Sequence, residues 1–183
     1  DQNLPVERLR VRVERGRELL DEYDGLLRRV TNETGVPGHY LLAFWGMETN
    51  FGSYTGKMSV PSSLATLACD QRRSDYFTKE LMAALRIIER GDVDPEQMEG
   101  SWAGAMGQMQ FMPSVYLQHA VDADNSGSVD LWGSIPDAMT SAGHFLEAMG
   151  WNRNERWGRE VQLPQGFDYS QAKGLAEKRP LSE

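Results

Sequence analysis

One carboxylate stands alone in an apolar stretch of the chain. Glu48 is the only charged side chain in residues 40–56, a stretch that begins YLLAFWGMETNFG. Apolar residues recur at helical spacing before it, and Asn50 and Gly52 are typical of a helix end, so Glu48 is predicted to lie in the last turn of a helix. The helix dipole and an apolar environment both disfavour the ionised carboxylate there, which raises its pKa. A carboxyl group that stays protonated near neutral pH can act as a general acid. A surface Glu at a helix end is the alternative.

A second uncharged segment follows later in the chain. Residues 100–121, GSWAGAMGQMQFMPSVYLQHAV, contain no Asp, Glu, Lys or Arg. The glycines of its first half predict a tight turn whose backbone closely approaches another group, and Pro113 with Ser114 predicts a new helix. A cleft lined by the aromatic, amide and hydroxyl groups of both segments would suit a neutral ligand such as a sugar chain. A helical core in which the aromatic residues merely pack is the alternative.

Helices are predicted to position these two segments. Apolar residues recur at helical spacing, the sequence has no internal repeat, and no region is rich in strand patterns, so the fold class is mainly α with little or no sheet. Residues 6–34 are predicted to form a long amphipathic helix broken at Gly16. Further helices are predicted at residues 64–69 and 74–90, from Pro113 and from Ser134, with one short strand at residues 160–164.

The composition is that of a globular protein of one domain. The chain has 183 residues, of which 40% are hydrophobic and 25% are charged. Its formal net charge of -8 argues against nucleic acid as a partner, because such binding depends on clustered Lys and Arg. No apolar run approaches the roughly 18 residues that span a bilayer. The single cysteine, Cys69, excludes an internal disulfide and is predicted to be a buried, unreactive thiol.

Three motifs occur in a specific order: WGMETNFG, SWAGAMGQMQFMPS and an acidic loop that ends in DLWGS. In this order and spacing they resemble the B-type lytic murein transglycosylases, which are periplasmic enzymes that cleave bacterial peptidoglycan. The resemblance runs from about residue 15 to residue 164. It implies a lysozyme-like α-helical catalytic domain over residues 1–163 and a weakly patterned tail over residues 164–183. It also implies cleavage of the bond between N-acetylmuramic acid and N-acetylglucosamine without water, which leaves a 1,6-anhydromuramoyl end.

The resemblance also implies roles for individual residues. Glu48 matches the single catalytic group, acting first as acid and then as base. Ser101 and Gln110 match positions that hold the acetamido groups, and Arg72 with Arg73 would meet carboxylates of the substrate, with a solvated loop as the alternative for the arginine pair. His144 stands where the family commonly has Tyr. The full predicted set of substrate-binding residues is Ser101, Gln108, Gln110, Arg72, Arg73, Tyr54, Met106, Phe111, Tyr116 and His144.

The acidic loop resembles the beginning of an EF-hand calcium loop over residues 122–137. Oxygen ligands stand on alternate residues and Gly127 occupies the tight turn, but Gly133 stands where the bidentate Glu is expected at the twelfth position. The loop is a candidate site for a structural calcium ion, and a hydrated connection before the next helix is the alternative. No cofactor is expected to be required. The candidate ligands are Asp122, Asp124, Ser126, Ser128 and Asp137.

The family resemblance implies partners and a compartment. We expect a monomer that acts on peptidoglycan glycan strands, with other cell-wall enzymes as further partners and no nucleic acid. The expected compartment is the periplasm, with outer-membrane association as a lipoprotein through an N-terminal anchor that this chain does not contain. Further C-terminal sequence is expected to contribute to the cleft. Three alternatives stay open: a muramidase that uses water, a murein-binding or scaffolding module with little turnover, and a small calcium-binding regulatory domain.

Overall fold

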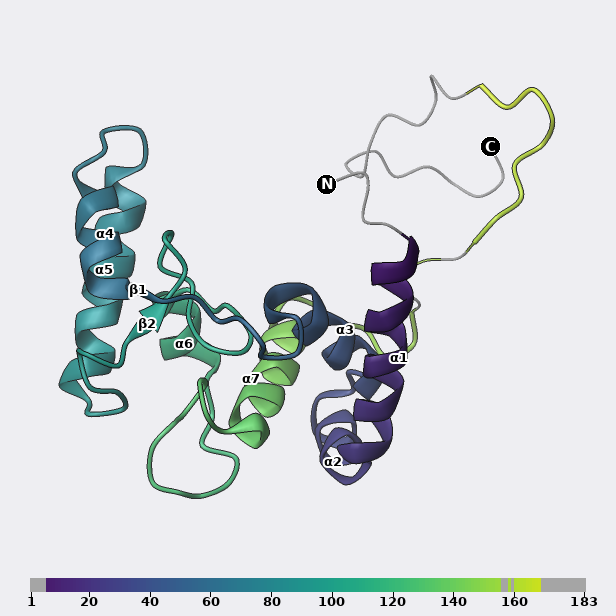
Figure 1. Ribbon diagram of the computed structural model, residues 1–183, viewed down its shortest axis with the longest axis horizontal. Helices are drawn as coiled ribbons and strands as arrows, with labels where there is room; N and C mark the ends of the chain where they lie inside the picture. The colour runs from purple at the N-terminus through teal and green to yellow at the C-terminus, as the bar shows by residue number, and fades with distance from the viewer. Residues whose placement is uncertain (1–5, 156–157, 159, 169–183) are drawn as a thin grey trace. The chain divides into compact units, whose positions relative to one another are not determined.

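The computed structural model describes residues 6–155, 158 and 160–168, and the chain divides into two units, residues 1–153 and 154–183. Among the described residues there are seven helices and one two-stranded sheet, so the predicted mainly α fold is confirmed. The predicted domain of residues 1–163 with a separate tail stays a prediction, and residues 169–183 of that tail lie outside the described residues. In chain order the elements are α1 (Val6–Glu22), α2 (Asp24–Thr34), α3 (Gly38–Thr49), β1 (Met58–Ser59), α4 (Val60–Ala68), α5 (Ser74–Glu89), β2 (Glu99–Gly100), α6 (Pro113–His119) and α7 (Ile135–Ala148) (Figure 1).

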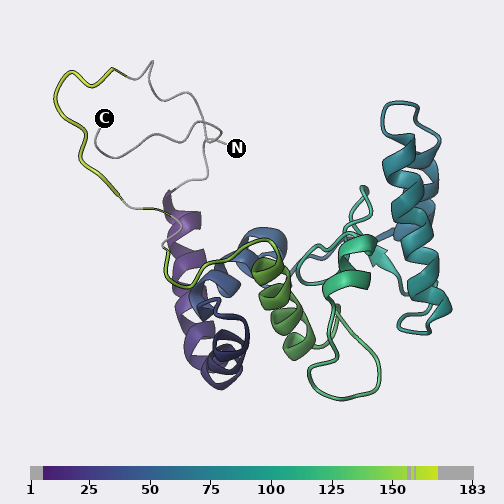
Figure 2. The same ribbon diagram turned by 180° about the vertical axis from the view of Figure 1, so that it is seen from behind.

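The helices of the first unit form two groups. Helices α1, α2, α3 and α7 pack on one another, whereas α4 packs against α5, which also packs against α6 (Figure 2). Between the groups, β1 and β2 pair antiparallel, with Met58 opposite Gly100 and Ser59 opposite Glu99. None of the described helices combines the length and hydropathy that a membrane span requires. The chain passes between the two groups in residues 50–59 and again in residues 120–134, and α6 also packs against α7.

The first predicted helix breaks at a different residue from the one expected. Gly16 lies inside α1, and the break is at Tyr23, whose φ of -104° and ψ of 16° leave helical geometry. The Tyr23 ring lies edge-on to Trp45 of α3, with 6.1 Å between the ring centroids. The break therefore coincides with a contact between helices and does not fall at the weak helix former Gly16.

Three further predictions from the sequence were wrong. Helix α4 begins at Val60 rather than near Leu64, because the Ser59 side chain accepts a hydrogen bond from the Ser62 N–H and caps the helix. Cys69, predicted to be buried, is exposed because α4 ends one residue before it. The strand predicted at residues 160–164 does not form, since this stretch has no regular structure.

A buried carboxylate joins α5 to α6. The Glu80 side chain is 4% exposed, and its two oxygens accept hydrogen bonds from the Ser114 N–H at 2.9 Å and from the Ser114 hydroxyl at 2.7 Å. Ser114 lies in the first turn of α6, where free N–H groups and the helix dipole favour an anion. Helix α6 forms the second half of the second uncharged segment. The contact with Glu80 therefore fixes that half against α5.

Ser114→Ala is expected to lower the free energy of unfolding by about 1–3 kcal/mol, because it leaves one oxygen of the buried Glu80 carboxylate without its donor. Urea unfolding measures the change. Ser62→Ala is the control, since the Ser62 hydroxyl is exposed and its loss is expected to cost no more than about 0.5 kcal/mol. Equal losses in the two variants would show that the Glu80 contact contributes nothing beyond an exposed hydrogen bond.

Candidate active site

Helix α3 ends directly after Glu48 in an unusual turn. Asn50, Phe51 and Gly52 have φ values of 51°, 58° and 76°, so three consecutive residues are left-handed. The Thr49 hydroxyl accepts a hydrogen bond from the Gly52 N–H at 3.0 Å and stabilises this turn. The chain therefore turns away sharply behind Glu48, in agreement with the predicted helix end.

The ring of Phe51 packs beneath the last turns of α3. It lies perpendicular to Trp45, with 5.7 Å between the ring centroids. It also lies so close to Gly46 that a Cβ atom there would be 2.7 Å from the ring. A larger residue at position 46 would displace the ring and with it the left-handed turn.

Gln108 joins three parts of the chain at one point, which we call the Gln108 junction (Gln108, Trp45, Thr49 and Trp132). Its Oε1 accepts a hydrogen bond from the Trp45 indole N–H at 2.8 Å, and its backbone oxygen accepts one from the Thr49 hydroxyl at 2.8 Å. Its Nε2 donates to the Trp132 backbone oxygen at 2.8 Å. Gln108 was predicted to bind substrate, but its amide group is used in these contacts, so its place in the structure is that of a residue that positions the two segments.

Trp45 and Thr49 were not predicted as site residues. A signal for them was present in the sequence, because a buried indole N–H or hydroxyl on an apolar helix requires a hydrogen-bond partner. Both side chains are almost fully buried, at 3% and 2% exposure. The identity of their partner, Gln108, could not be found from the sequence because it lies about 60 residues away in the chain.

The two segments also contact each other through the Gln110 side chain and through two glycines. Gln110, with a φ of 50°, donates from Nε2 to the backbone oxygens of Thr55 at 3.0 Å and Gly107 at 3.1 Å. Its Oε1 has no hydrogen-bond partner among the described residues. Gly56 lies so close to Gly100 that a Cβ atom on it would be 2.1 Å from the Gly100 backbone oxygen. This is the close backbone approach that the glycines of the second segment predict.

Ser101 closes a short turn at the start of the second segment. Its N–H donates to the Ala105 backbone oxygen at 2.8 Å, and its hydroxyl oxygen accepts from the Ala105 N–H at 3.1 Å. The hydroxyl proton of Ser101 is not used in these bonds, so the group can still donate to a ligand.

Three of the residues predicted to bind substrate lie in the hydrophobic core. Met106, Phe111 and Tyr116 are exposed by 0%, 3% and 1%. The Tyr116 hydroxyl donates to the Val129 backbone oxygen at 2.8 Å, and burial raises the pKa of Tyr116. These side chains support the second segment from behind and do not reach its open face.

The predicted arginine pair lies at the start of α5. Arg72 donates to Asp70 at 2.7 Å, and this hydrogen bond lowers the pKa of Asp70 to about 2. The Arg73 guanidinium lies over the ring of Tyr76, 4.5 Å from its centroid. Both arginines are exposed and held by neighbours on their own turn, an arrangement that leaves their outer faces open to an anionic group.

Tyr54 and His144 were also predicted to bind substrate. Tyr54 is 67% exposed on the segment that leaves Glu48, and its N–H donates to the Thr49 backbone oxygen at 3.1 Å. His144 of α7 contacts Glu33 of α2, with 2.9 Å between Nε2 and the carboxylate. The structure therefore uses His144 to join two helices.

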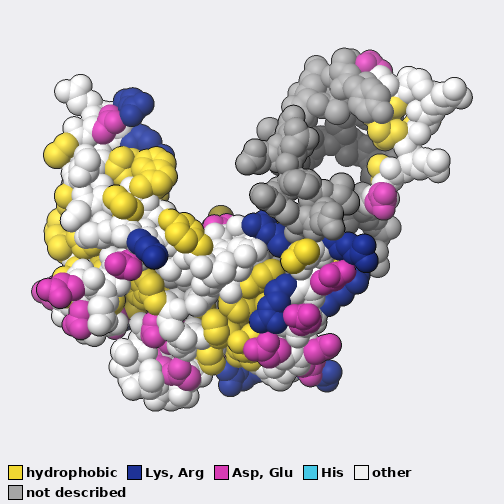
Figure 3. All heavy atoms as spheres, viewed as in Figure 1, with side chains coloured by type: hydrophobic (Ala, Val, Ile, Leu, Met, Phe, Trp, Pro, Cys, Tyr) yellow, Lys and Arg dark blue, Asp and Glu magenta, His cyan; other side chains and the backbone are white. Residues whose placement is uncertain are grey.

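Glu48 itself has no hydrogen bond or ion pair to any described residue. Residue Glu48 is exposed overall, but neighbouring protein atoms partly surround its carboxyl group. This partial burial raises the pKa of Glu48 above the usual range, as the sequence predicts. A carboxyl group in this state can donate a proton to a bound ligand and take one back. Figure 3 shows that the surface beside the α4–α5 pair is hollowed, with hydrophobic side chains along it.

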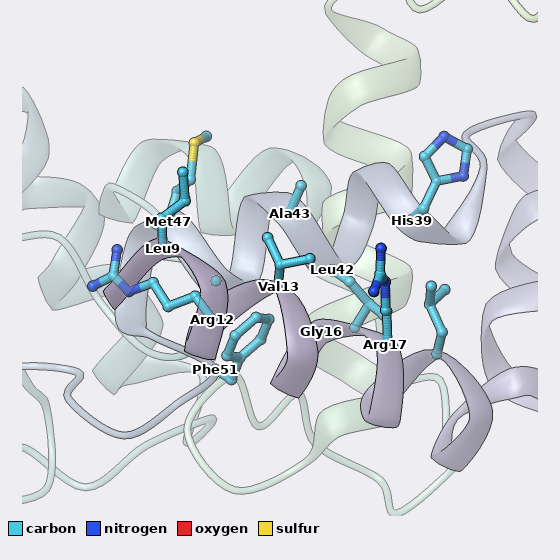
Figure 4. Close-up of a pocket in the computed structure, with 12 residues that line it drawn as sticks. Leu9, Arg12, Val13, Gly16, Arg17, His39, Leu42, Ala43, Met47 and Phe51 are labelled. Atoms are coloured by element: carbon cyan, nitrogen blue, oxygen red, sulfur yellow. The ribbon is translucent and has the colours of Figure 1, made fainter. Parts of the chain in front are cut away.

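An apolar pocket of about 340 Å³ lies between α1 and α3, close to this site but separate from it (Figure 4). Leu9, Val13 and Leu42 line it, together with Phe51 and the charged side chain of Arg12. Glu48 does not line this pocket. A proton transfer from Glu48 would therefore take place outside it.

The acidic loop brings three carboxylates together. Asp122, Asp124 and Asp137 each place one oxygen within 4.8 Å of the others. Asp137, at the start of α7, is fully buried and accepts hydrogen bonds from the N–H groups of Ala123 at 2.8 Å and Asp130 at 2.9 Å. A hydrogen bond from Ser134 lowers the pKa of Asp124. Grouped carboxylate oxygens are the donors that a hard cation such as Ca²⁺ prefers, so the described residues fit such an ion.

Comparison with known proteins assigns this domain to a class and then to a family. Its helical fold places it among the lysozyme-like α-helical domains, and a sequence model of the Transglycosylase SLT domain matches residues 7–183. The chain therefore belongs to the Transglycosylase SLT domain family. It is 36% identical to membrane-bound lytic murein transglycosylase B of Escherichia coli (strain K12) over 181 residues, which cover 92% of this chain and 50% of that protein.

Solved structures confirm the predicted lysozyme-like fold. SltB3 from Pseudomonas aeruginosa, in complex with NAG-anhNAM-pentapeptide, is 46% identical with a TM-score of 0.82 over 87% of this chain and 43% of that one. Lytic transglycosylase Slt35 from Escherichia coli, in complex with calcium, is 35% identical with a TM-score of 0.75 over 93% of this chain and 58% of that one. The chain thus spans about half the length of these relatives.

Glu48→Gln is expected to make the fold more stable than wild type at neutral pH. Partial burial raises the pKa of Glu48 in the folded state above its unfolded value, so wild-type stability falls as the pH rises from the unfolded pKa through the folded pKa. Glutamine has no charge and avoids this loss. Urea unfolding at about pH 4 and about pH 7 measures the difference between the variants.

Glu89→Gln is the matched control, because Glu89 is the last residue of α5 and tests the effect of the helix dipole on an exposed carboxylate. For each variant, the gain in unfolding free energy over wild type is compared between the two pH values. If this gain rises no more with pH for Glu48→Gln than for Glu89→Gln, burial does not raise the pKa of Glu48.

Proposed function

We propose that this chain carries the catalytic site of a lytic transglycosylase, which cleaves the β-1,4 bond between N-acetylmuramic acid and N-acetylglucosamine in peptidoglycan. The observation that carries the proposal is the single carboxyl group of Glu48, unpaired among the described residues, at the end of a helix fixed by the Gln108 junction. Membership of the family and the names of the relatives support the same activity.

In the proposed reaction Glu48 acts twice. Its protonated carboxyl first donates to the glycosidic oxygen, so that the bond from the muramoyl C1 breaks and N-acetylglucosamine leaves with a new hydroxyl group. The muramoyl C6 oxygen then forms a bond to C1, and the Glu48 carboxylate takes the proton of that hydroxyl. The product is a 1,6-anhydromuramoyl end, no water is consumed, and Glu48 ends the cycle protonated as it began.

The neutral surroundings of Glu48 support a single-carboxylate mechanism. Ordinary retaining and inverting glycosidases need a second carboxylate as nucleophile or base. Neither residues 40–56 nor residues 100–121 contain another acid, and Glu48 has no carboxylate partner among the described residues. Groups of the substrate itself, the C6 hydroxyl and the acetamido oxygen, would supply the nucleophile and stabilise the oxocarbenium-like centre.

Neutral groups around the acid would orient the sugar rings. The free Oε1 of Gln110 can accept from an acetamido N–H, and the Ser101 hydroxyl can donate to an acetamido oxygen. Tyr54 offers an exposed ring on the segment that leaves Glu48. The outer faces of Arg72 and Arg73 would meet the carboxylates of the lactyl group or the peptide stem.

The proposal extends to location and to a bound ion. The proposed location is the periplasm, where peptidoglycan would be accessible, and one relative is named as membrane-bound, which supports association with a membrane. The relative whose structure is in complex with calcium supports a structural calcium ion at Asp122, Asp124 and Asp137, with Ser126 and Ser128 on the same loop. Such an ion would hold the loop before α7 and has no part in the reaction.

Glu48→Gln is expected to lower the release of 1,6-anhydro muropeptides from purified sacculi by roughly 10²–10⁴-fold, the contribution of general acid-base catalysis. Mass spectrometry of the soluble products measures both the amount and the type of end. Glu89→Gln, which changes a carboxyl outside both neutral segments, is the control and is expected to keep wild-type release.

Two of the alternatives have their own outcome in this experiment. Products with reducing ends would indicate a muramidase that uses water. Binding to sacculi without release of soluble products would indicate a scaffolding module. Wild-type rates in Glu48→Gln would overturn the assignment of the acid.

Added calcium is expected to raise the melting temperature, because an ion bound to the folded state stabilises it by mass action. At a concentration about a hundredfold above Kd the gain is roughly 2.7 kcal/mol, or about 5–11 °C. Asp122→Asn removes one ligand charge and is expected to lose most of the shift, whereas Asp75→Asn on α5 keeps it. Equal melting temperatures with calcium and with a chelator would exclude the site.

A further inference from the structure

An exposed indole lies on a turn beside the candidate active site. Trp102 is 70% exposed, so the face of its indole is accessible to a ligand. It directly follows Ser101, in a segment without a charged residue. An exposed aromatic ring in neutral surroundings at the edge of a proposed glycan site is a candidate contact for the ligand.

The turn that carries Trp102 is held firmly. Ser101 makes two hydrogen bonds with Ala105, and the Gly104 N–H donates to the Ser101 backbone oxygen at 3.0 Å. Gly104 is buried against Leu64 of α4, so closely that a Cβ atom would be 2.4 Å from the leucine. The indole is therefore carried on a backbone that is already ordered, and binding to it requires little further ordering of the chain.

Trp102 and Glu48 are carried by different elements. Glu48 belongs to α3, whereas the turn of residues 101–105 packs against α4. In Figure 1 the turn projects from the end of β2 toward the side on which α4 and α5 are joined. A sugar ring that rests on Trp102 is thus displaced from the proposed cleavage position toward the α4–α5 pair.

We propose that the Trp102 indole is a stacking surface for a pyranose ring of the glycan strand outside the cleavage position, and that it makes the protein favour long strands. The inference rests on the proposed function and adds a binding position to it. Pyranose rings have an apolar face of C–H groups that can lie flat on an aromatic ring, and no charge on the turn opposes this contact.

The test measures kcat/KM for anhydro-product release from two peptide-free substrates. One is a long glycan strand, and the other is a tetrasaccharide of the same repeating disaccharide. Trp102→Ala is expected to lower the ratio of the long to the short substrate by roughly 3–10-fold, which corresponds to the loss of one aromatic contact. Trp102→Phe keeps an aromatic face and is expected to recover most of the loss. Leu85→Ala, which removes an exposed apolar side chain of α5 outside both neutral segments, is expected to keep the wild-type ratio.

A binding measurement makes the result independent of turnover. In the Glu48→Gln background, calorimetry with the long strands is expected to give a Kd that Trp102→Ala raises by the same factor. Circular dichroism and melting show that the variant is folded, since an exposed side chain contributes little to stability.

Three outcomes separate this inference from the proposed function. An unchanged ratio and Kd in Trp102→Ala, with an active wild type, would overturn the stacking surface alone. A loss in Trp102→Phe as large as in Trp102→Ala would also overturn it, because stacking would then not explain the effect. A wild-type chain that neither binds nor cleaves strands of any length would overturn the proposed function and this inference with it.

Discussion

The candidate site depends on the hydrogen bonds of one buried amide. Gln108 accepts from Trp45, accepts from Thr49 through its backbone oxygen, and donates to the backbone of Trp132. These bonds connect the helix that carries the acid, the second uncharged segment and the loop before α7. The Trp45 indole N–H and the Thr49 hydroxyl are buried polar groups that would be destabilising without a partner, so both depend on Gln108. The position of Glu48 relative to the Ser101 turn and to Gln110 follows from this arrangement.

Glu48 differs from Gln108 in its lack of hydrogen-bond partners. Glu48 has no partner among the described residues, and the protein raises its pKa by partial burial, without an ion pair or a hydrogen bond. A paired carboxylate would be held ionised by its neighbour, as Asp70 is held by Arg72. Rigid neighbours around an unpaired group thus produce a carboxyl that is fixed in space and still free to exchange its proton. The other charged residues of the predicted sites lie outside the two uncharged segments, in the arginine pair and in the acidic loop.

Local chemistry in the sequence was sufficient for part of this description. The end of α3 at Asn50, the span of α5 and the cap of α7 by Ser134 could be predicted, because each depends on residues within one or two turns. The break at Tyr23 and the burial of Tyr116 could not, because contacts between distant segments decide them. For the same reason Gln108 was predicted to bind substrate. Its residue type suits either role, and only the fold shows that its amide is already occupied.

The contact between Gly56 and Gly100 has a consequence for how such a protein can change during evolution. The two segments meet there through main-chain atoms, with no room for a Cβ atom on Gly56. Substitutions at Gly56 cannot change the distance between the two segments gradually, since any side chain would force the segments apart. Changes in ligand preference are therefore expected at exposed residues such as Tyr54 and Trp102, which can be exchanged without disturbing this contact.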